Sequence, residues 1–188
     1  MRSIRTRLAV LATILAVALV PGLAGSATAT ATSRPAEPVI RGTVTLKIGG
    51  ANVVNIDGKL YAALLPSPRP AKFDVVEAPD GIQFRYQNTG GLVYADPSLE
   101  PFSQLSVGRP GEVPPHSTWT VASPPADADE DLEADDLPDR HWVVTIKLAG
   151  TDQYIGRHFV ENRSLLPKRV LLLPPGVRAP LFVVEPVS

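Results

Sequence analysis

The sequence has no cysteine among its 188 residues. Without cysteine there are no disulfide cross-links, thiol nucleophiles, redox motifs or zinc–thiolate sites. The chain must therefore fold through a packed core and backbone hydrogen bonds, and its length is sufficient for one such core.

Enzyme motifs and metal-site motifs are also lacking. The sequence has no Gly-x-Ser-x-Gly segment, and no Ser-His-Asp set can be assembled from spacing. His116, His141 and His158 do not have the spacing of metal ligands. The pairs Gly49-Gly50 and Gly90-Gly91 are typical of turns rather than of phosphate-binding loops. These absences predict a protein that is not an enzyme and that holds no metal or cofactor.

A helical period is missing after residue 40. Apolar residues there alternate or cluster in short runs, which are separated by Gly, Pro, Asn and Asp. The sequence also carries 20 prolines, which do not fit into long helices. Both observations predict an all-β protein with many short strands.

Residues 1–31 have the pattern of a secretory signal. Three arginines precede an apolar run, Leu8–Val20, which is followed by small residues with Ala-x-Ala sites. The run is shorter than the roughly 20 residues that span a bilayer, and no second such run follows. We therefore expect cleavage near Ala27, Ala29 or Ala31 rather than an uncleaved anchor. We also expect a flexible leader over 32–40 and a secreted, extracellular protein with no membrane partner.

Negative charge is concentrated in one segment. The formal net charge of −1 becomes −4 (−1 − 3) without the signal arginines Arg2, Arg5 and Arg7. Eight acidic residues lie between Asp127 and Asp139, and setting them aside gives +4 (−4 + 8). Residues 123–140 are therefore predicted to be an acidic, solvated linker. No charge run indicates nucleic acid as a partner.

One pattern occurs three times: an aromatic residue, any residue, then valine. It stands at Phe73-Asp74-Val75, Trp119-Thr120-Val121 and Phe182-Val183-Val184, each with prolines before and after it. The aromatic residues are 46 (119 − 73) and 63 (182 − 119) positions apart, and the longer interval contains the acidic linker. Without that insertion the period would be about 40–45 residues, which is typical of repeat architectures. We expect the aromatic residues to point into a common core.

Each repeat divides into four short strands, and Asp57-Gly58 predicts a tight hairpin turn in the first repeat. Three four-strand units favour a β-trefoil over residues 41–188, with pseudo-threefold symmetry, a six-stranded barrel and three capping hairpins. A propeller usually needs at least four blades, and a sandwich has no reason to repeat three times. The predicted strands are Thr43–Ile48, Asn52–Ile56, Leu60–Leu65, Lys72–Glu77, Ile82–Gln87, Leu92–Ala95, Gln104–Val107, Thr118–Ala122, Trp142–Leu148, Gln153–Gly156, Val170–Leu173 and Leu181–Glu185.

The third unit carries the most distinctive motif. Ile155-Gly156-Arg157 is followed by Glu161-Asn162-Arg163-Ser164-Leu165-Leu166-Pro167-Lys168 and by Leu171-Leu172-Leu173-Pro174-Pro175-Gly176-Val177. On these residues, and more weakly on 50–62 and 100–107, the chain resembles the cospin-like serine protease inhibitors of mushrooms, which are β-trefoil proteins. Asn162 stands where the family has aspartate. In the family this unit comes first and here it comes last. The resemblance therefore implies a circular permutant, with the acidic linker where the family's termini would be joined.

The resemblance implies a secreted, monomeric, reversible inhibitor of serine endopeptidases, with trypsin-like enzymes as the expected partner. Its contact loop would run from Arg157 to Arg169. Trypsin-like enzymes have an acidic primary pocket, and Arg163 offers a planar, permanently charged side chain for it. Lys168 and then Arg178 are the next candidates for that pocket. The implied contact residues are Glu161, Asn162, Arg163, Ser164, Leu165, Leu166, Pro167 and Lys168.

Alternatives remain open. Arg163 can instead pair with Glu161 and fix the loop. A carbohydrate-binding, lectin-like trefoil would use Trp142 and Tyr154 as sugar platforms, although core packing explains these residues as well and none of the three aromatic repeats has the Gln-x-Trp of such proteins. A related trefoil family inhibits cysteine proteases, and the sequence does not separate the two target classes.

Overall fold

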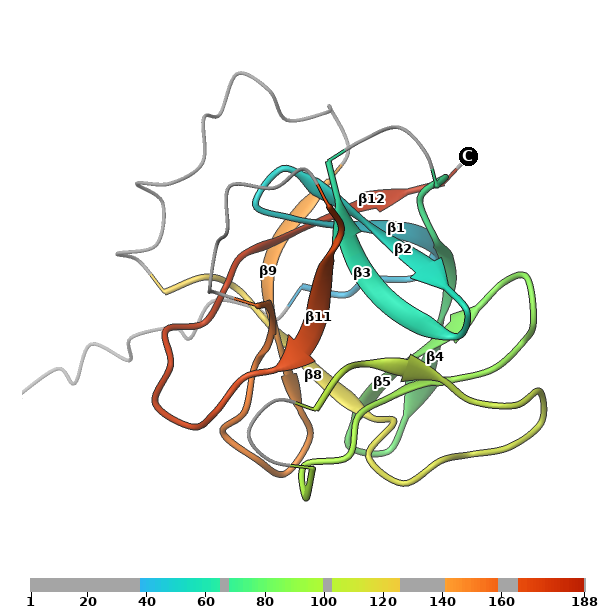
Figure 1. The fold of residues 1–188 in the computed structure, drawn as a ribbon. Coiled ribbons are helices and arrows are strands. Elements are labelled where there is room, and N and C mark those ends of the chain that lie inside the picture. The colour runs from blue at the N-terminus through green and yellow to red at the C-terminus, as the bar shows by residue number, and fades with distance from the viewer. Residues whose placement is uncertain (1–37, 65–67, 100–102, 126–140, 159–165, 188) are drawn as a thin grey trace, which may run out of the picture. The chain divides into compact units, whose positions relative to one another are not determined.

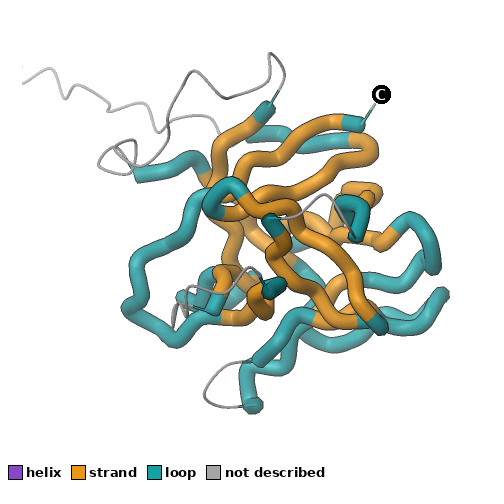
Figure 2. The backbone as a smooth tube through the Cα atoms, turned by 45° about the horizontal axis from the view of Figure 1, so that its top comes forward, coloured by secondary structure: helices purple, strands orange, loops and turns teal. Residues whose placement is uncertain are grey.

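The computed structural model describes residues 38–64, 68–99, 103–125, 141–158 and 166–187. All of them belong to one compact unit, Pro35–Ser188. They form β-strands, turns and loops and no helix, so none of the described segments is a helix able to cross a membrane (Figures 1 and 2). The strands are β1 (Gly42–Ile48), β2 (Ala51–Ile56), β3 (Lys59–Ala63), β4 (Lys72–Ala78), β5 (Gly81–Tyr86), β6 (Val93–Tyr94), β7 (Ser106–Val107), β8 (Trp119–Ala122), β9 (Trp142–Leu148), β10 (Ile155–Arg157), β11 (Lys168–Leu172) and β12 (Phe182–Pro186).

Six of these strands form a closed ring. β1 pairs with β12, β12 with β9, β9 with β8, β8 with β5, β5 with β4, and β4 pairs back with β1, always antiparallel. A closed ring leaves no free edge among its strands, so they cannot recruit a further strand. The ring confirms the predicted all-β class and its six-stranded barrel.

The remaining strands form three pairs, β2–β3, β6–β7 and β10–β11. These pairs meet through their main chains. Leu60 N–H donates to the Leu105 carbonyl at 3.0 Å, and Leu105 N–H donates to the Val170 carbonyl at 2.9 Å. β11 also pairs directly with β3, and Figure 1 shows these two strands side by side. The third predicted strand of each unit therefore contacts the third strand of another.

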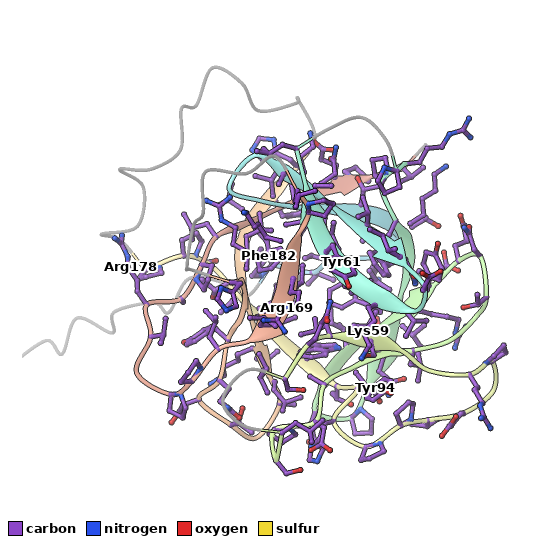
Figure 3. All side chains as sticks on the ribbon, viewed as in Figure 1. Lys59, Tyr61, Tyr94, Arg169, Arg178 and Phe182 are labelled. Carbon is purple, nitrogen blue, oxygen red and sulfur yellow. The ribbon has the colours of Figure 1, made fainter. Side chains whose placement is uncertain are left out.

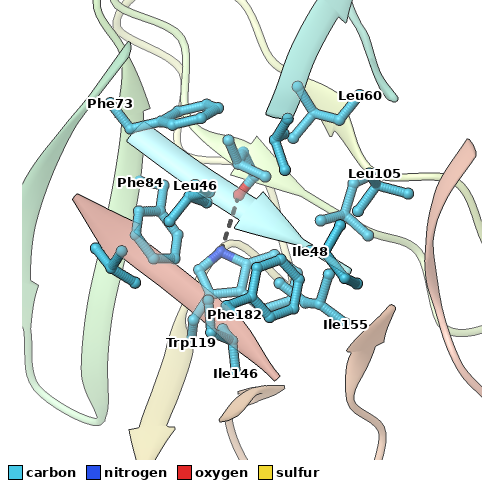
Figure 4. Close-up of a cluster of buried hydrophobic side chains, with 14 of the residues drawn as sticks. Leu46, Ile48, Leu60, Phe73, Phe84, Leu105, Trp119, Ile146, Ile155 and Phe182 are labelled. Atoms are coloured by element: carbon cyan, nitrogen blue, oxygen red, sulfur yellow. Dashed lines mark hydrogen bonds between the residues drawn. The ribbon is translucent and has the colours of Figure 1, made fainter. Parts of the chain in front are cut away.

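The three repeated aromatic residues lie in the core, as expected. Phe73 and Trp119 are 0% exposed and Phe182 is 1% exposed, and Figure 4 shows them in one cluster. Phe84 meets Phe73 edge-on, with ring centroids 6.1 Å apart. The buried indole N–H of Trp119 donates to the Val93 carbonyl at 3.3 Å, which avoids an unsatisfied donor. Burial of each such side chain contributes about 1.5–3 kcal/mol.

The hairpin turn predicted at Asp57-Gly58 is confirmed. Both residues have positive φ, 51° and 79°, as a type I′ turn requires. Ile56 pairs with Lys59 across the turn, and Gly58 N–H donates to Asn55 Oδ1 at 2.9 Å. The local sequence therefore predicts this turn, and a hydrogen bond from Val107 N–H to the Gly58 carbonyl at 2.8 Å also holds it.

All twelve predicted strands have a counterpart, but several boundaries were wrong. β3 ends at Ala63 and not at Leu65, and β7 begins at Ser106 and not at Gln104. The boundaries of β10 and β11 also differ. β10 begins at Ile155, because Tyr154 makes only an isolated bridge to Lys147. β11 begins at Lys168 and not at Val170, because Lys168 and Arg169 find pairing partners on β3. That pairing joins distant parts of the chain, so a local pattern does not reveal it.

Candidate functional site

The connection between β10 and β11 carries the predicted contact residues. The structure describes its two stems, whereas Glu161, Asn162, Arg163, Ser164 and Leu165 lie outside the described residues. Leu166 is 71% exposed at the end of the connection. Pro167 follows it, and Lys168 is the first residue of β11 rather than a loop residue.

Main-chain hydrogen bonds join the two stems. Ile155 pairs with Leu172, Gly156 with Leu171, and Arg157 with Val170. Beyond the last of these pairs, His158 N–H donates to the Arg169 carbonyl at 3.0 Å. The connection therefore leaves and re-enters the fold at a fixed separation, which is that of two neighbouring strands.

β11 is anchored on both faces. Val170, Leu171, Leu172 and Leu173 are 0–3% exposed, whereas a strand with one solvated face shows alternating burial. Val170 and Leu172 belong to the central core cluster. Leu172 N–H also donates to the Ser103 carbonyl at 2.8 Å. The stem that follows the connection is thus held by the core as well as by its partner strand.

Gly156 allows β10 to lie close to the residues between β11 and β12. A Cβ at this position would contact Leu173 Cδ1, would lie 2.8 Å from Leu173 Cγ, and would lie 3.0 Å from Pro180 Cγ. Real Cβ atoms are not found that close, so these neighbours leave no space for a side chain. The glycine of the Ile155-Gly156-Arg157 motif therefore has a packing role.

Arg157 ends β10 beside the turn between β1 and β2. Its guanidinium covers Gly49, because a Cβ on Gly49 would lie 3.1 Å from the Arg157 Cζ atom. Gly49 also has a positive φ of 53°, which favours glycine. Arg157 is thus part of the stem, where it packs on the first unit.

Arg178, the third candidate for the primary pocket, lies on a different connection, between β11 and β12. Arg178 is exposed. Figure 3 shows Arg178 away from Arg169, which marks the end of the contact loop. The structure therefore places Arg178 on a different connection from the described stem residues of β10 and β11.

The stem has neighbours that the sequence analysis did not select. Lys168 lies opposite Ala62, and Arg169 lies opposite Tyr61. β3 is therefore the strand next to the point where the connection enters β11. Leu64, at the end of β3, is 59% exposed. The predicted trefoil could have indicated that β3 lies beside this connection, because the three hairpins of a trefoil meet at one end of the barrel.

A separate hollow of about 430 Å³ is lined by residues from 80 to 150, none of which belongs to the β10–β11 connection. Its lining is polar and apolar in mixture and includes Asp80, Gln83, His116 and Ser117, but no Trp, Tyr or Phe among the described residues. Trp142 packs against the core cluster. Neither Trp142 nor Tyr154 lines the hollow, so the described residues bring neither sugar platform to it.

Metal chemistry finds no support in the described part of the chain. No three residues among His, Cys, Asp and Glu gather there closely enough to hold an ion. The described residues build a closed all-β barrel domain in which a hydrogen-bonded strand pair carries this connection. Such a scaffold fits a protein that displays a segment to a partner.

Comparison with known families identifies the last part of the chain. Residues 135–188 match the sequence profile of the family Peptidase inhibitor I66. The resemblance to the cospin-like inhibitors is thereby confirmed for this stretch of the chain. No curated protein matches the sequence closely enough to count as a relative.

Several solved structures share the fold at low sequence identity. A proteinase inhibitor from Coprinopsis cinerea has a TM-score of 0.53 and 15% identity, over 80% of this chain and 100% of that chain. A salivary protein from Culex quinquefasciatus has a TM-score of 0.54 and 14% identity, over 80% and 96% of the two chains. Lysenin in complex with phosphocholine has a TM-score of 0.52 and 20% identity, and 81% of this chain covers 47% of that chain. This chain thus spans about half the length of lysenin, and the three likenesses show the fold alone.

Proposed function

We propose that the protein is a secreted, reversible inhibitor of serine endopeptidases, with trypsin-like enzymes as its targets, and that the β10–β11 connection enters the enzyme's active site. The observation that carries the proposal is the overlap of two findings. The family match covers residues 135–188, and the same stretch contains a connection whose stems are fixed by β3, β10 and the core.

Fixed stems favour inhibition over cleavage. A loop that is held at both ends loses little conformational entropy on docking, so its contacts contribute more of their free energy to affinity. If the enzyme cuts Arg163-Ser164, the new ends stay near each other because β10 and β11 remain paired, and resynthesis competes with release. Arg163 is the proposed side chain for the acidic primary pocket. Lys168 is the less suitable alternative, because its backbone is engaged in the β11–β3 ladder.

The experiment is an inhibition titration of the mature protein against trypsin, chymotrypsin, subtilisin and papain, with Arg163→Ala beside the wild type. We expect Arg163→Ala to weaken trypsin inhibition at least about 100-fold, as for an anchor residue at the centre of an interface. Arg85→Ala removes an exposed arginine on β5 and is the matched control. Trypsin inhibition unchanged in Arg163→Ala would contradict the assignment and direct attention to Lys168→Ala and Arg178→Ala. Inhibition of papain alone would indicate the cysteine protease class.

We further propose that the barrel is a β-trefoil with pseudo-threefold symmetry. Each repeated aromatic residue pairs with two residues of the ring, and one of the two is always the last residue of its strand: Tyr86, Leu148 or Ile48. These pairs support three related units: Phe73 with Val44 and Tyr86, Trp119 with Ile82 and Leu148, and Phe182 with Val144 and Ile48.

Circular permutation is part of the same proposal. If the three units are similar, two such chains can be superposed in sequence order whichever unit comes first. A similarity over the whole chain therefore does not test the permutation. The test is to superpose residues 153–173 unit by unit on a mushroom inhibitor. A better fit to its third unit than to its first would contradict the permutation.

Secretion and monomeric state are proposed from the signal pattern and from the closed ring, which offers no edge for strand exchange. Expression with residues 1–31 in a secreting host should give a shortened protein in the medium. N-terminal sequencing should show that this protein begins near residue 32. Size-exclusion chromatography should give a single species of monomer mass. A cell-retained, full-length product or a dimer would contradict these points.

A further inference from the structure

Four long side chains share one outer face beside the proposed contact loop. Arg169 on β11 lies directly opposite Tyr61 on β3. Lys59 is two residues from Tyr61 on the same strand and so projects from the same face. Lys59 lies opposite Ser106 on β7, which lies opposite Tyr94 on β6. We call Arg169, Tyr61, Lys59 and Tyr94 the strand face, and Figure 3 shows all four.

The exposure of these side chains shows that they point outward, although Leu171, on the same side of β11 as Arg169, is buried. Leu60 and Val170 alternate with them along β3 and β11 and are 2% and 1% exposed, and Val93 beside Tyr94 is 2% exposed. Lys59 and Arg169 are exposed, whereas Tyr61 and Tyr94 are half-buried. The two phenol rings thus present apolar surface that a partner can cover, and the two cationic side chains extend into solvent.

The cations of the strand face have no carboxylate partner in the described part of the chain. Described ion pairs use Arg41, Lys47 and Lys147 instead. Among the described residues, the hydrogen-bond partner of Lys59 Nζ is the Ser106 hydroxyl, at 3.5 Å. Arg and Tyr, which supply three of the four residues, are enriched in protein–protein contacts, whereas Lys is more typical of the rim.

The strand face is continuous with the stem of the contact loop. Arg169 directly follows Lys168, where the loop enters β11. The β11–β3 register pairs Lys168 with Ala62, and its continuation by two residues would bring Leu166 opposite Leu64. These leucines are 71% and 59% exposed, so exposed apolar side chains stand at the end of β3 and just before β11.

We propose that the strand face is a second contact surface for the same protease that the loop inhibits, and that it fits an enzyme whose surface beside the active site is acidic. The inference rests on the proposed function and adds a surface that selects among the target enzymes. Continuity with the loop stem and charge complementarity both favour this occupant. A lipid surface is disfavoured, because two cations contribute only about 1 kcal/mol each there. Nucleic-acid binders typically neutralise about 6–10 phosphates, which two cations do not approach.

The two kinds of side chain predict different kinetic effects. Exposed cations at the rim accelerate association through long-range attraction, and salt screens that attraction. The rings of Tyr61 and Tyr94 instead lose water on contact and slow dissociation. Lys59 and Arg169 should therefore act on the association rate constant, and Tyr61 on the dissociation rate constant.

The experiment measures both rate constants for each enzyme that the wild type inhibits, at about 50 mM and about 500 mM salt. In the double variant Lys59→Ala/Arg169→Ala we expect association to slow about tenfold at low salt and to lose most of its salt dependence. Tyr61→Ala should speed dissociation about tenfold. Arg85→Ala should change neither constant more than about twofold. Thermal unfolding of every variant shows that the fold is retained, and Lys59→Glu/Arg169→Glu provides a second test with a larger effect in the same direction.

The outcomes separate the two proposals. Unchanged constants in the double variant and in Tyr61→Ala, together with inhibition by the wild type, would overturn the second surface and leave the proposed function intact. A wild type that inhibits none of the four enzymes would overturn both. Sedimentation of the wild type but not of the double variant with phosphatidylserine vesicles would overturn the protease as occupant in favour of a lipid surface.

Discussion

Two strand pairs of the molecule, β2–β3 and β10–β11, are closed in different ways. β2–β3 has five residue pairs and ends in the two-residue turn Asp57-Gly58. β10–β11 has three residue pairs and spans the connection 158–167 between its strands. The first hairpin carries the local signals for its own closure. The second depends on β3, Ser103 and the core to hold its stems.

The difference separates folding from function along the chain. In β2–β3 the turn residues decide the register, so a change there acts on the fold. In β10–β11 the register is fixed from outside, so the connection is not required to close the hairpin. Closing a longer loop costs only about 0.6 kcal/mol for each doubling of its length. A long connection at this place is therefore compatible with a stable domain and is available for contact with a partner.

The largest effect is expected when the second hairpin is closed like the first. Residues 159–168 are replaced by Asp-Gly, so that His158 and Arg169 flank the turn as Ile56 and Lys59 do in β2–β3. We expect the domain to fold, because β11 keeps its buried residues, and protease inhibition to fall at least about 1,000-fold. Circular dichroism and thermal unfolding show whether the domain folds, and the inhibition titration measures the loss of inhibition. Inhibition within about threefold of wild type would show that another surface acts.

A smaller effect is expected at Gly156, where the second hairpin is packed most tightly. Gly156→Ala places a Cβ against Leu173 and Pro180, and such overpacking costs about 1–3 kcal/mol. Urea unfolding measures this loss. Gly50→Ala is the control for a glycine with open space around it, since no atom lies within 4 Å of its Cβ position, and only backbone strain of about 1 kcal/mol is expected there. A Gly156→Ala protein as stable as wild type would mean that β10 can shift, and with it the stem of the connection.

The sequence predicted the parts of the fold that depend on short-range signals. The turn at Asp57-Gly58 and the three buried aromatic residues were found because turn chemistry and repetition are local patterns. The start of β11 was missed, since Lys168 and Arg169 are strand residues only through their pairing with β3. The strand face was missed for the same reason, because its members come from strands that are separate in the sequence.

The candidate site was predictable only as a motif. Its residues Glu161 to Leu165 lie outside the described residues, so their roles stay predictions from the family resemblance. What the structure adds is the stem: the packing of Gly156 and Arg157 and the burial of Val170–Leu173. No sequence pattern assigns Gly156 to a close contact, because its partners Leu173 and Pro180 are reached only once the strands pair.

The third strand pair, β6–β7, offers the smallest test, since the start of its connection contains two local hydrogen bonds to one carboxylate. Ser98 donates to Asp96 Oδ1 from its hydroxyl at 2.6 Å and from its backbone N–H at 2.9 Å. These hydrogen bonds stabilise the carboxylate and lower the pKa of Asp96 below its ordinary value of 3.8. The stabilisation is present when Asp96 is ionised, above about pH 4, and is lost as the pH falls through the lowered pKa of the folded state.

Ser98→Ala should therefore raise the pKa of Asp96 toward 3.8, because it removes the hydroxyl donor that lowers it most. An NMR titration of the Asp96 carboxyl measures the pKa directly. In urea unfolding the variant should be less stable than wild type at pH 6, and the difference should shrink toward pH 2.5, since a protonated Asp96 no longer gains from the lost donor. The hairpin β2–β3 supplies the contrast, because the Gly58 N–H to Asn55 bond involves no titrating group. Its loss in Asn55→Ala should cost the same at both pH values, and a pH-independent cost in Ser98→Ala as well would mean that the Asp96 carboxylate does not hold this connection.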